Sequence, residues 1–499
     1  MFKKLSSLLL ILVIFSSSIF TGTVLAADGE ETMPPEHHYL DMASVETYTE
    51  GLGITAEQYE SLKDTIFGAT RSCAANCNIS SFSIKYNSTT GDLLNNLIRK
   101  GDPETFHVDG ISLTTMGSGS SKKFYQFKFT YKYTKAVYDE MREEMIAAAD
   151  ELLEGVEGNN ALSDIQKALI LHDRLAVYCE YDVENYYAGA VPDSSYTMYG
   201  AMVNRICVCE GYTKAYSYLL DRVGIKNYYC SSIQLGHIWN IVYIDGVKYH
   251  IDTTWDDPTY DITGYVTHRF FLCSTEKMIE NRHNANDFDT TPTATTYDDA
   301  FWGDSTSSFI LFGNDIYFID HETGTLNVWS GDRISAVKTV SSRWRSASGG
   351  IYMGNFSCLT TDGTYLYYSL YDTVMRYDPI SMTSTKMYTY TADAANPGFG
   401  IYGIKTEDMV LTVDVYNNPG FGRTTKADYE FTVEYSHPAT PGDVNADGKI
   451  TSKDLAAMKK FIAGNITELE LVFCNSDIDS SGSVNSKDLS RLKKLIAQG

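Results

Sequence analysis

The chain has 499 residues, a net charge of −24 at pH 7, nine cysteines and 43% hydrophobic residues. A chain of this length exceeds one hydrophobic core, so we expect about three domains. The negative charge argues against nucleic acid and anionic membranes as partners, because both repel an acidic surface. It agrees with an extracellular protein and with one that binds calcium.

The first 26 residues have the pattern of a secretory signal peptide. Lys3 and Lys4 precede the apolar run LLLILVIF (8–15), and VLA (24–26) is a small-residue cleavage site. The run is too short to span a bilayer and no stop-transfer pattern follows, which disfavours a membrane anchor. We expect a signal peptide at 1–26, a flexible lead-in at 27–45, and a secreted mature protein without a membrane span.

The region 46–290 mixes strand and helix patterns. FYQFKFTYKY (124–133) alternates as a strand does, and 137–153 is typical of a helix. Ser163 and Gln166 form a capping box before the next helix. His172 lies on the apolar face of that helix, which favours a packed core histidine over a ligand. Because nine is an odd number, at least one cysteine lies outside any intramolecular disulfide, and Cys73 with Cys77 can either pair or pack.

The segment ICVCEGYTKAY (206–216) holds two cysteines in different local positions. Apolar residues at helical spacing predict a helix over 211–223, and Gly224 stops it. Cys209 therefore lies at or just before the first turn, where the partial positive charge of a helix favours a thiolate. Cys207 lies in the approach loop, either as a filler or as a redox neighbour.

The segment GHIWNIVYIDGVKYHIDTTWDDP (236–258) predicts a hairpin that turns at Asp245-Gly246. A symmetric loop pairs residue 244 with residue 247 and, counting outward, His237 with Thr254. Asp252 then shares the face of His237 on the diagonal, about 7–8 Å away and within reach of a hydrogen bond. A thiol becomes an effective nucleophile when an imidazole takes its proton and a carboxylate orients that imidazole. Cys209, His237 and Asp252 are the candidate catalytic residues.

Residues 291–437 change character and are rich in tyrosine, threonine, glycine and aspartate. DIYFID (315–320), TYLYYSLY (364–371) and YEFTVEY (429–435) predict an all-β accessory module. Its strand clusters recur at about 45 to 50 residues, but three such clusters are too few for a closed propeller. The module serves packing or spacing, or it binds a ligand. HPATP (437–441) is a short stiff linker.

An internal repeat follows the linker. DVNADGKITSKD (443–454) and DIDSSGSVNSKD (477–488) place oxygen side chains at positions 1, 3, 5, 9 and 12 and glycine at position 6, with a backbone carbonyl at position 7. Ca²⁺ needs this ring of oxygens, and the glycine permits the sharp turn inside it. The predicted ligands of two Ca²⁺ ions are Asp443, Asn445, Asp447, Lys449, Thr451 and Asp454, and Asp477, Asp479, Ser481, Ser483, Asn485 and Asp488.

The repeat at 438–499 resembles a type I dockerin, a small all-α calcium-binding module. The resemblance implies that the protein binds a cohesin module of a scaffoldin and belongs to a cellulosome. It places the cohesin contacts at loop positions 10 and 11 and in the following helix. These residues are Ser452, Lys453, Lys459 and Lys460, and Ser486, Lys487, Lys493 and Lys494. Both repeats offer the same residues, so two binding orientations related by a half-turn are expected.

The middle region resembles the transglutaminase-like superfamily in VCEGYTKAY, GHIWNIV and YHIDTTWDDP. The resemblance covers about 130 to 290 and implies an α+β papain-like fold with Cys209 as the nucleophile, His237 as the base and Asp252 as the acid. It also implies an oxyanion hole that uses the Cys209 backbone N–H. Residues 46–290 are assigned to this domain, and no cofactor is expected for catalysis.

Three functions agree with this organisation. The first is acyl transfer from a peptide or glutamine amide, ending in a cross-link when an amine resolves the thioester and in proteolysis or deamidation when water does. Abundant water outside the cell favours hydrolysis. The second is a catalytically inert binding or structural protein tethered to the scaffold. The reactivity of Cys209 distinguishes the two, because a structural cysteine is unreactive. The third is service to polysaccharide breakdown, although no paired carboxylates indicate a glycoside hydrolase.

Overall fold

The computed structural model describes residues 30–32, 45–259, 261–340, 344–345, 351–352, 357–391, 400–416, 429–435, 442–445, 449–464, 473–476, 478 and 484–498. The predicted signal peptide, most of the lead-in and the linker lie outside these residues. The described residues form two compact units, one that includes 30–32, 45–98 and 107–134 and another that includes 99–106 and the described residues from 135 onward. Small antiparallel sheets and helices alternate along the chain, which confirms the expectation of a multidomain protein.

The first unit combines helices with an antiparallel sheet of order β1-β3-β4-β2. The predicted strand at 124–133 is present as β4, and it ends at Tyr131. Thr55 and Gln58 form a capping box that begins α2. The elements are α1 (Val45–Leu52), α2 (Ala56–Arg71), α3 (Ser88–Gly101), β1 (Glu30–Thr32), β2 (Asn76–Asn78), β3 (Val108–Met116) and β4 (Lys123–Tyr131), with short 3₁₀ turns at Ser80–Phe82 and Gly119–Ser121. A further 3₁₀ turn, Pro103–His107, lies mostly in residues 99–106 of the second unit.

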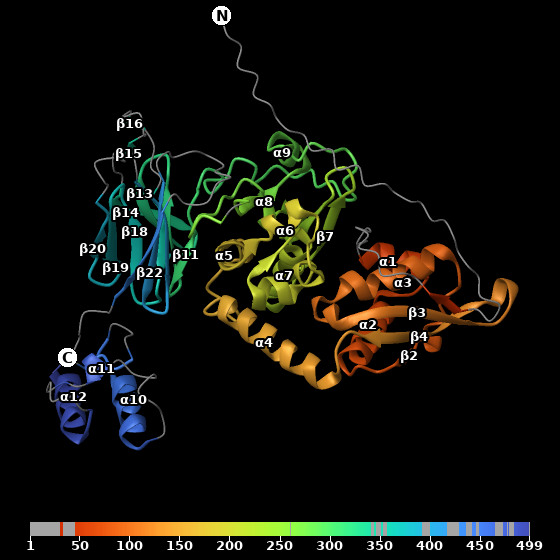
Figure 1. The fold of residues 1–499 in the computed structure, drawn as a ribbon, viewed down its shortest axis with the longest axis horizontal. Coiled ribbons are helices and arrows are strands. Elements are labelled where there is room, and N and C mark those ends of the chain that lie inside the picture. Colours follow the sequence, from red (N-terminus) through yellow and green to blue (C-terminus); the bar gives the residue numbers. More distant parts are fainter. Residues whose placement is uncertain are drawn as a thin grey trace, which may run out of the picture. The chain divides into compact units, whose positions relative to one another are not determined.

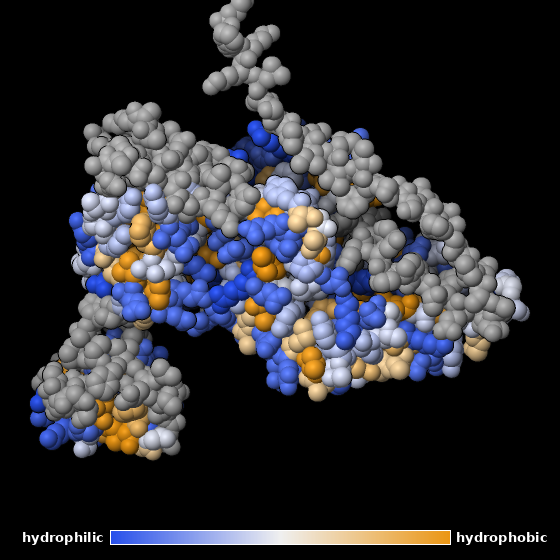
Figure 2. Space-filling view, viewed as in Figure 1, coloured by the Kyte–Doolittle hydropathy of each residue, from blue (hydrophilic) through white to orange (hydrophobic). Residues whose placement is uncertain are grey.

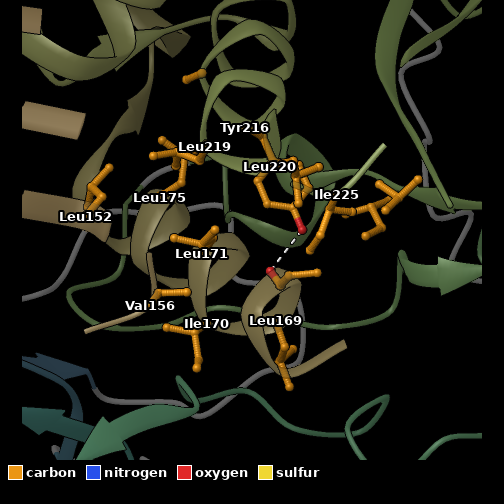
Figure 3. Packing of buried hydrophobic residues seen from close by; sticks show 14 of the residues in the cluster. Leu152, Val156, Leu169, Ile170, Leu171, Leu175, Tyr216, Leu219, Leu220 and Ile225 are labelled. Atoms are coloured by element: carbon orange, nitrogen blue, oxygen red, sulfur yellow. Dashed lines mark hydrogen bonds between the residues drawn. The ribbon is translucent and has the colours of Figure 1, made fainter. Parts of the chain in front are cut away.

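The second unit begins with packed helices. The predicted capping box is confirmed, because Ser163 and Gln166 exchange side-chain and backbone hydrogen bonds at the start of α5 (Asp164–Tyr178). Figure 3 shows the leucines of α5 facing those of α7 (Cys209–Arg222), and the hydroxyl of Tyr216 donates to the carbonyl of Ala168 at 2.9 Å. The other helical elements are α4 (Lys135–Leu153), α6 (Val183–Ala188), a 3₁₀ turn (Asp193–Tyr196) and a π turn (Gly200–Asn204).

A four-stranded antiparallel sheet of order β10-β9-β8-β7 packs against these helices. Val242, Ile244 and Ile251 of the sheet share one buried cluster with the leucines of α5 and α7. The sheet therefore sets the N-terminus of α7 beside the strand ends. Its elements are β7 (Asn227–Ser232), β8 (His237–Ile244), β9 (Val247–Ile251) and β10 (Phe271–Cys273), with α8 (Thr253–Asp256) and α9 (Thr275–Glu280) in the connections.

Only strands and turns occur in the described part of 310–435, in three successive antiparallel sheets with one extra strand pair (teal to blue in Figure 1). Phe309, Ile316 and Phe318 enter the buried cluster of α5 and α7, so this region shares a core with the helices. The strands are β11 (Ile310–Phe312), β12 (Asp315–Asp320), β13 (Thr325–Ser330), β14 (Arg333–Thr339), β15 (Trp344–Arg345), β16 (Ile351–Tyr352), β17 (Leu359–Thr361), β18 (Leu366–Ser369), β19 (Thr373–Asp378), β20 (Thr383–Thr389), β21 (Gly400–Glu407), β22 (Val410–Tyr416) and β23 (Tyr429–Glu434).

The C-terminal segment holds α10 (Ser452–Ile462), α11 (Phe473–Ser476) and α12 (Ser486–Gln498). Val444, Met458 and Leu492 form its small buried core. Across the described residues of the whole chain, no helix is both long and apolar enough to pass through a membrane. Figure 2 shows mostly hydrophilic residues on the described surface seen from this side, with small hydrophobic patches among them.

Candidate active site and calcium loops

The local structure around Cys209 agrees with the sequence prediction. Cys209 is the first residue of α7 and is buried. The hydroxyl of Thr213, one turn later, donates to the carbonyls of Cys209 at 2.8 Å and of Ile238 at 3.0 Å. The first turn of α7 is therefore fixed to β8, the strand that begins with His237.

The hairpin register is confirmed as far as Ile251, which pairs with Asn240. The predicted pairing of His237 with Thr254 does not form, because the strand ends and Asp252 caps α8 by accepting a hydrogen bond from the Trp255 N–H at 3.2 Å. The side chains still meet, and His237 Nε2 lies 2.7 Å from Asp252 Oδ2. A helix cap thus replaces the expected diagonal strand contact.

The site is buried, and its charges are matched. Burial lowers the pKa of His237, but the charge and hydrogen bond of Asp252 and a hydrogen bond with Cys209 outweigh burial and raise this pKa to about 10. Burial raises the pKa of Asp252, but the two neighbouring imidazoles outweigh it and hold this pKa well below its usual range. An imidazolium between a carboxylate and a sulfur atom is the charge arrangement of cysteine-dependent catalysis.

A second histidine, His283, contacts the same carboxylate, and no motif in the sequence predicts this contact. Its Nε2 lies 2.8 Å from Asp252 Oδ2, and its ring centroid lies 4.0 Å from that of Trp255. Burial lowers the pKa of His283, although Asp252 opposes the shift. A neutral His283 can therefore donate from Nε2 and hold Asp252 in place. His283 stands outside the three motifs, and only its contact identifies it.

A second buried network supports the segment that follows Asp252. His172 Nδ1 lies 2.8 Å from Asp173 Oδ1, and His172 Nε2 lies 3.2 Å from Asp256 Oδ2. Burial lowers the pKa of His172, but the two carboxylates outweigh it and raise this pKa to about 9. His268 also contacts Asp173, at 3.0 Å. His172 is therefore a core histidine, and it ties α5 to α8.

Cys207 occupies a different environment from Cys209. It lies in β6 (Ile206–Cys207), a short strand parallel to β5 (Glu180–Tyr181), where the sequence predicted an approach loop before the helix. Its Sγ is 3.4 Å from Cys179 Sγ, and burial raises its pKa well above the ordinary value. A Cβ added at Gly211 would lie 2.8 Å from the Cys207 Sγ, so glycine lets α7 approach this strand.

Cys209 and His237 line a cleft of about 480 Å³. Tyrosines from β5, α6 and the following 3₁₀ turn line it together with Trp255, which is 40% exposed. These tyrosines are Tyr181, Tyr186, Tyr187 and Tyr196. The cleft also contains two exposed arginines, Arg269 and Arg282. Aromatic and cationic groups therefore line the cleft near the buried thiol.

The described calcium-loop residues cluster at the starts of α10 and α12. Asp454 is fully buried and its carboxylate accepts from the N–H groups of Thr451 at 2.7 Å and Asn445 at 3.2 Å. Asp488 is fully buried too, and it accepts from the Asn485 N–H at 2.9 Å. Of the remaining predicted ligands, Asp443 and Lys449 are described. Asp447, Asp477, Asp479, Ser481 and Ser483 lie outside the described residues.

The predicted cohesin-contact residues all lie on the surface. Ser452 and Lys453 begin α10, as Ser486 and Lys487 begin α12, and each helix carries a lysine pair two turns later. These pairs are Lys459 with Lys460 and Lys493 with Lys494, and all eight side chains are exposed.

Comparison with known proteins identifies one domain of the chain. Residues 441–497 match the dockerin type I domain. A dockerin implies calcium binding, docking to a cohesin and an extracellular, cellulosome-associated protein. No curated protein matches the chain. A solved structure described as "Crystal structure of a TGase" is 16% identical with a TM-score of 0.20, and the match covers 35% of this chain and 49% of that one. The chain spans about half of that structure, and a TM-score this low does not establish a common fold.

Proposed function

We propose that the protein is a secreted, cellulosome-docked enzyme that transfers or hydrolyses acyl groups of peptide or glutamine amides through Cys209, His237 and Asp252. The contact of His237 with Asp252, beside a cysteine at a helix start, carries this proposal. The resemblance of three sequence segments to transglutaminase-like proteins supports it, as does the cleft that contains Cys209 and His237.

The roles follow from the geometry. Cys209 Sγ attacks the amide carbonyl and forms a thioester, while the C–N bond breaks and His237 gives its proton to the leaving amine. Asp252 binds Nε2 of His237, so Nδ1 remains for exchange with the sulfur. Cys209 is the first residue of α7, where first-turn N–H groups have no intrahelical acceptor, and its N–H is the proposed oxyanion donor. Water or an amine then resolves the thioester.

The dockerin would hold Ca²⁺ in its two loops. The buried carboxylates of Asp454 and Asp488 fit this cation, because Ca²⁺ prefers hard oxygen ligands and each carboxylate stands at the last position of its twelve-residue loop. Asp443, Asn445, Thr451 and the backbone carbonyl of Lys449 would complete the described part of the first loop. The ion would order the loops and, with them, α10 and α12.

One experiment separates the possible outcomes for the thiol. The mature protein and its Cys209→Ala variant are incubated with casein and a fluorescent primary amine, and both amine incorporation and new N-termini are measured. Amine incorporation that the variant lacks indicates a transglutaminase, and new N-termini that it lacks indicate a peptidase. Equal signals from the two proteins would contradict the proposal. If both lack signal, pH-dependent alkylation of Cys209 distinguishes a narrow-specificity enzyme from an inert fold.

Docking needs its own test. Calorimetric titration with a recombinant cohesin should give a complex for the wild-type chain. Because both repeats present a lysine pair, alanine replacement of either pair alone should leave binding, and replacement of both pairs should weaken it strongly. Full binding by the variant that lacks both pairs would refute these contacts.

A further inference from the structure

Two exposed arginines enter the cleft from segments that a hydrogen bond joins. The Asn281 side chain donates to the Arg269 carbonyl at 2.5 Å, so the strand approach at 269 and the end of α9 lie together. Phe270 follows Arg269, His283 follows Arg282, and their ring centroids are 4.6 Å apart. Both arginines therefore line the same cleft as His237, on segments that pack against each other. No ion pair of Arg282 occurs among the described residues.

The backbone of Arg282 is unusual. Helix α9 ends in two hydrogen bonds, from the Arg282 N–H to the Ile279 carbonyl at 3.0 Å and from the His283 N–H to the Met278 carbonyl at 2.9 Å. This is the Schellman pattern, whose first residue beyond the cap adopts a positive φ and is usually glycine. Arg282 has φ +87° at that position. A side chain is strained there, so the fold itself would favour glycine.

The aromatic side of the cleft offers a different chemistry. Tyr186 and Tyr187 of α6 are 54% and 65% exposed, and their ring centroids lie 5.9 Å apart. Exposed aromatic rings bind flat or apolar side chains, whereas guanidinium groups bind carboxylates with paired hydrogen bonds. Both kinds of group line the cleft that contains Cys209.

We propose that Arg269 and Arg282 form a subsite for an acidic side chain of the substrate, so that the enzyme selects polypeptide segments that combine a carboxylate with aromatic or apolar residues. This inference rests on the proposed function, because it concerns the substrate of that enzyme. A measurement of peptide binding tests it independently of catalysis. The basic pair attracts such segments although the chain has a net charge of −24. Attraction between exposed charges is screened by salt, so selection weakens as ionic strength rises.

The experiment measures binding to the Cys209→Ala chain, which cannot turn over. Two fluorescein-labelled peptides of equal length contain tyrosine and differ only in glutamate against glutamine, and fluorescence anisotropy gives each Kd. We expect the glutamate peptide to bind about fivefold more tightly at low salt, which corresponds to about 1 kcal/mol for an exposed ion pair. Arg282→Gly should remove most of this preference, and Arg269→Ala combined with it should remove the rest.

Two controls separate recognition from structure. Arg282→Gly should keep or raise the melting temperature, because glycine adopts the positive φ without strain. Arg333→Ala removes an exposed charge at the start of β14 and should keep the full preference. Equal Kd values for the two peptides, or a preference that survives loss of both arginines, would overturn the inference. Arginine-dependent binding without any Cys209-dependent product would support the subsite and refute the proposed function.

Discussion

Replacing Asp252 by asparagine tests whether His237 is charged in the folded protein. Burial lowers the pKa of His237, but Asp252 and, after it, Cys209 outweigh burial and raise this pKa to about 10, from an ordinary value of 6.5. Between these two values the folded chain binds one proton more than the unfolded chain. This contribution to stability is complete below pH 6.5 and disappears as the pH rises through 10. The free energy of unfolding should therefore fall by about 1.4 kcal/mol per pH unit from this group in that window.

The Asp252→Asn variant lacks most of this pH-dependent contribution to stability, because the asparagine amide carries no charge that would stabilise a buried imidazolium. From pH 7 to pH 9, the difference in unfolding free energy between wild type and Asp252→Asn should shrink by about 2–3 kcal/mol. Urea unfolding followed by tryptophan fluorescence measures it, since Trp239, Trp255 and Trp302 lie in this part of the second unit. Asp332→Asn removes an exposed carboxylate and should give no such pH-dependent difference. If the difference in unfolding free energy between wild type and Asp252→Asn stays constant from pH 7 to pH 9, His237 is not charged in the folded protein.

Three further predictions concern separate parts of the chain. Chelation of Ca²⁺ should abolish the calorimetric transition of the dockerin and its cohesin binding, and an unchanged transition would contradict calcium-dependent folding. Oxidation by a low-molecular-weight disulfide should join Cys179 to Cys207, whose sulfur atoms are 3.4 Å apart, and a non-reducing peptide map with these two peptides still separate would contradict it. Tyr216→Phe removes a buried hydroxyl that donates to the Ala168 carbonyl and should cost about 1 kcal/mol of unfolding free energy in urea, whereas an equal or higher stability would show that this bond contributes nothing.

The pH dependence and the redox prediction concern the two segments that hold the proposed catalytic residues. Cys207 ends β6 two residues before the predicted nucleophile, and Asp252 caps α8 at the end of the hairpin. A constraint on either segment sets the separation of sulfur and imidazole, on which acyl transfer depends steeply. The buried networks around Asp252 and Asp173 hold α8 in place, since one includes Asp252 at its start and the other reaches Asp256 at its end.

The sequence by itself determined the features that depend on neighbouring residues. The capping box at Ser163, the start of α7 at Cys209 and the turn at Asp245 follow from local backbone preferences, and the structure has all three. The two calcium loops could be predicted for the same reason, since each set of ligands lies within twelve consecutive residues. The match to the dockerin type I domain confirms the prediction of a dockerin.

Only the tertiary structure decided which distant segments meet. His283 reaches Asp252 across 31 residues, Cys179 reaches Cys207 across 28, and the Asn281 side chain donates a hydrogen bond to the Arg269 carbonyl. Periodicity and spacing carry no information about such contacts, because they arise when packing brings separate loops to one place. The same limit explains why His237 does not pair with Thr254. Strand β9 ends before Asp252, and Asp252 is the N-cap of α8.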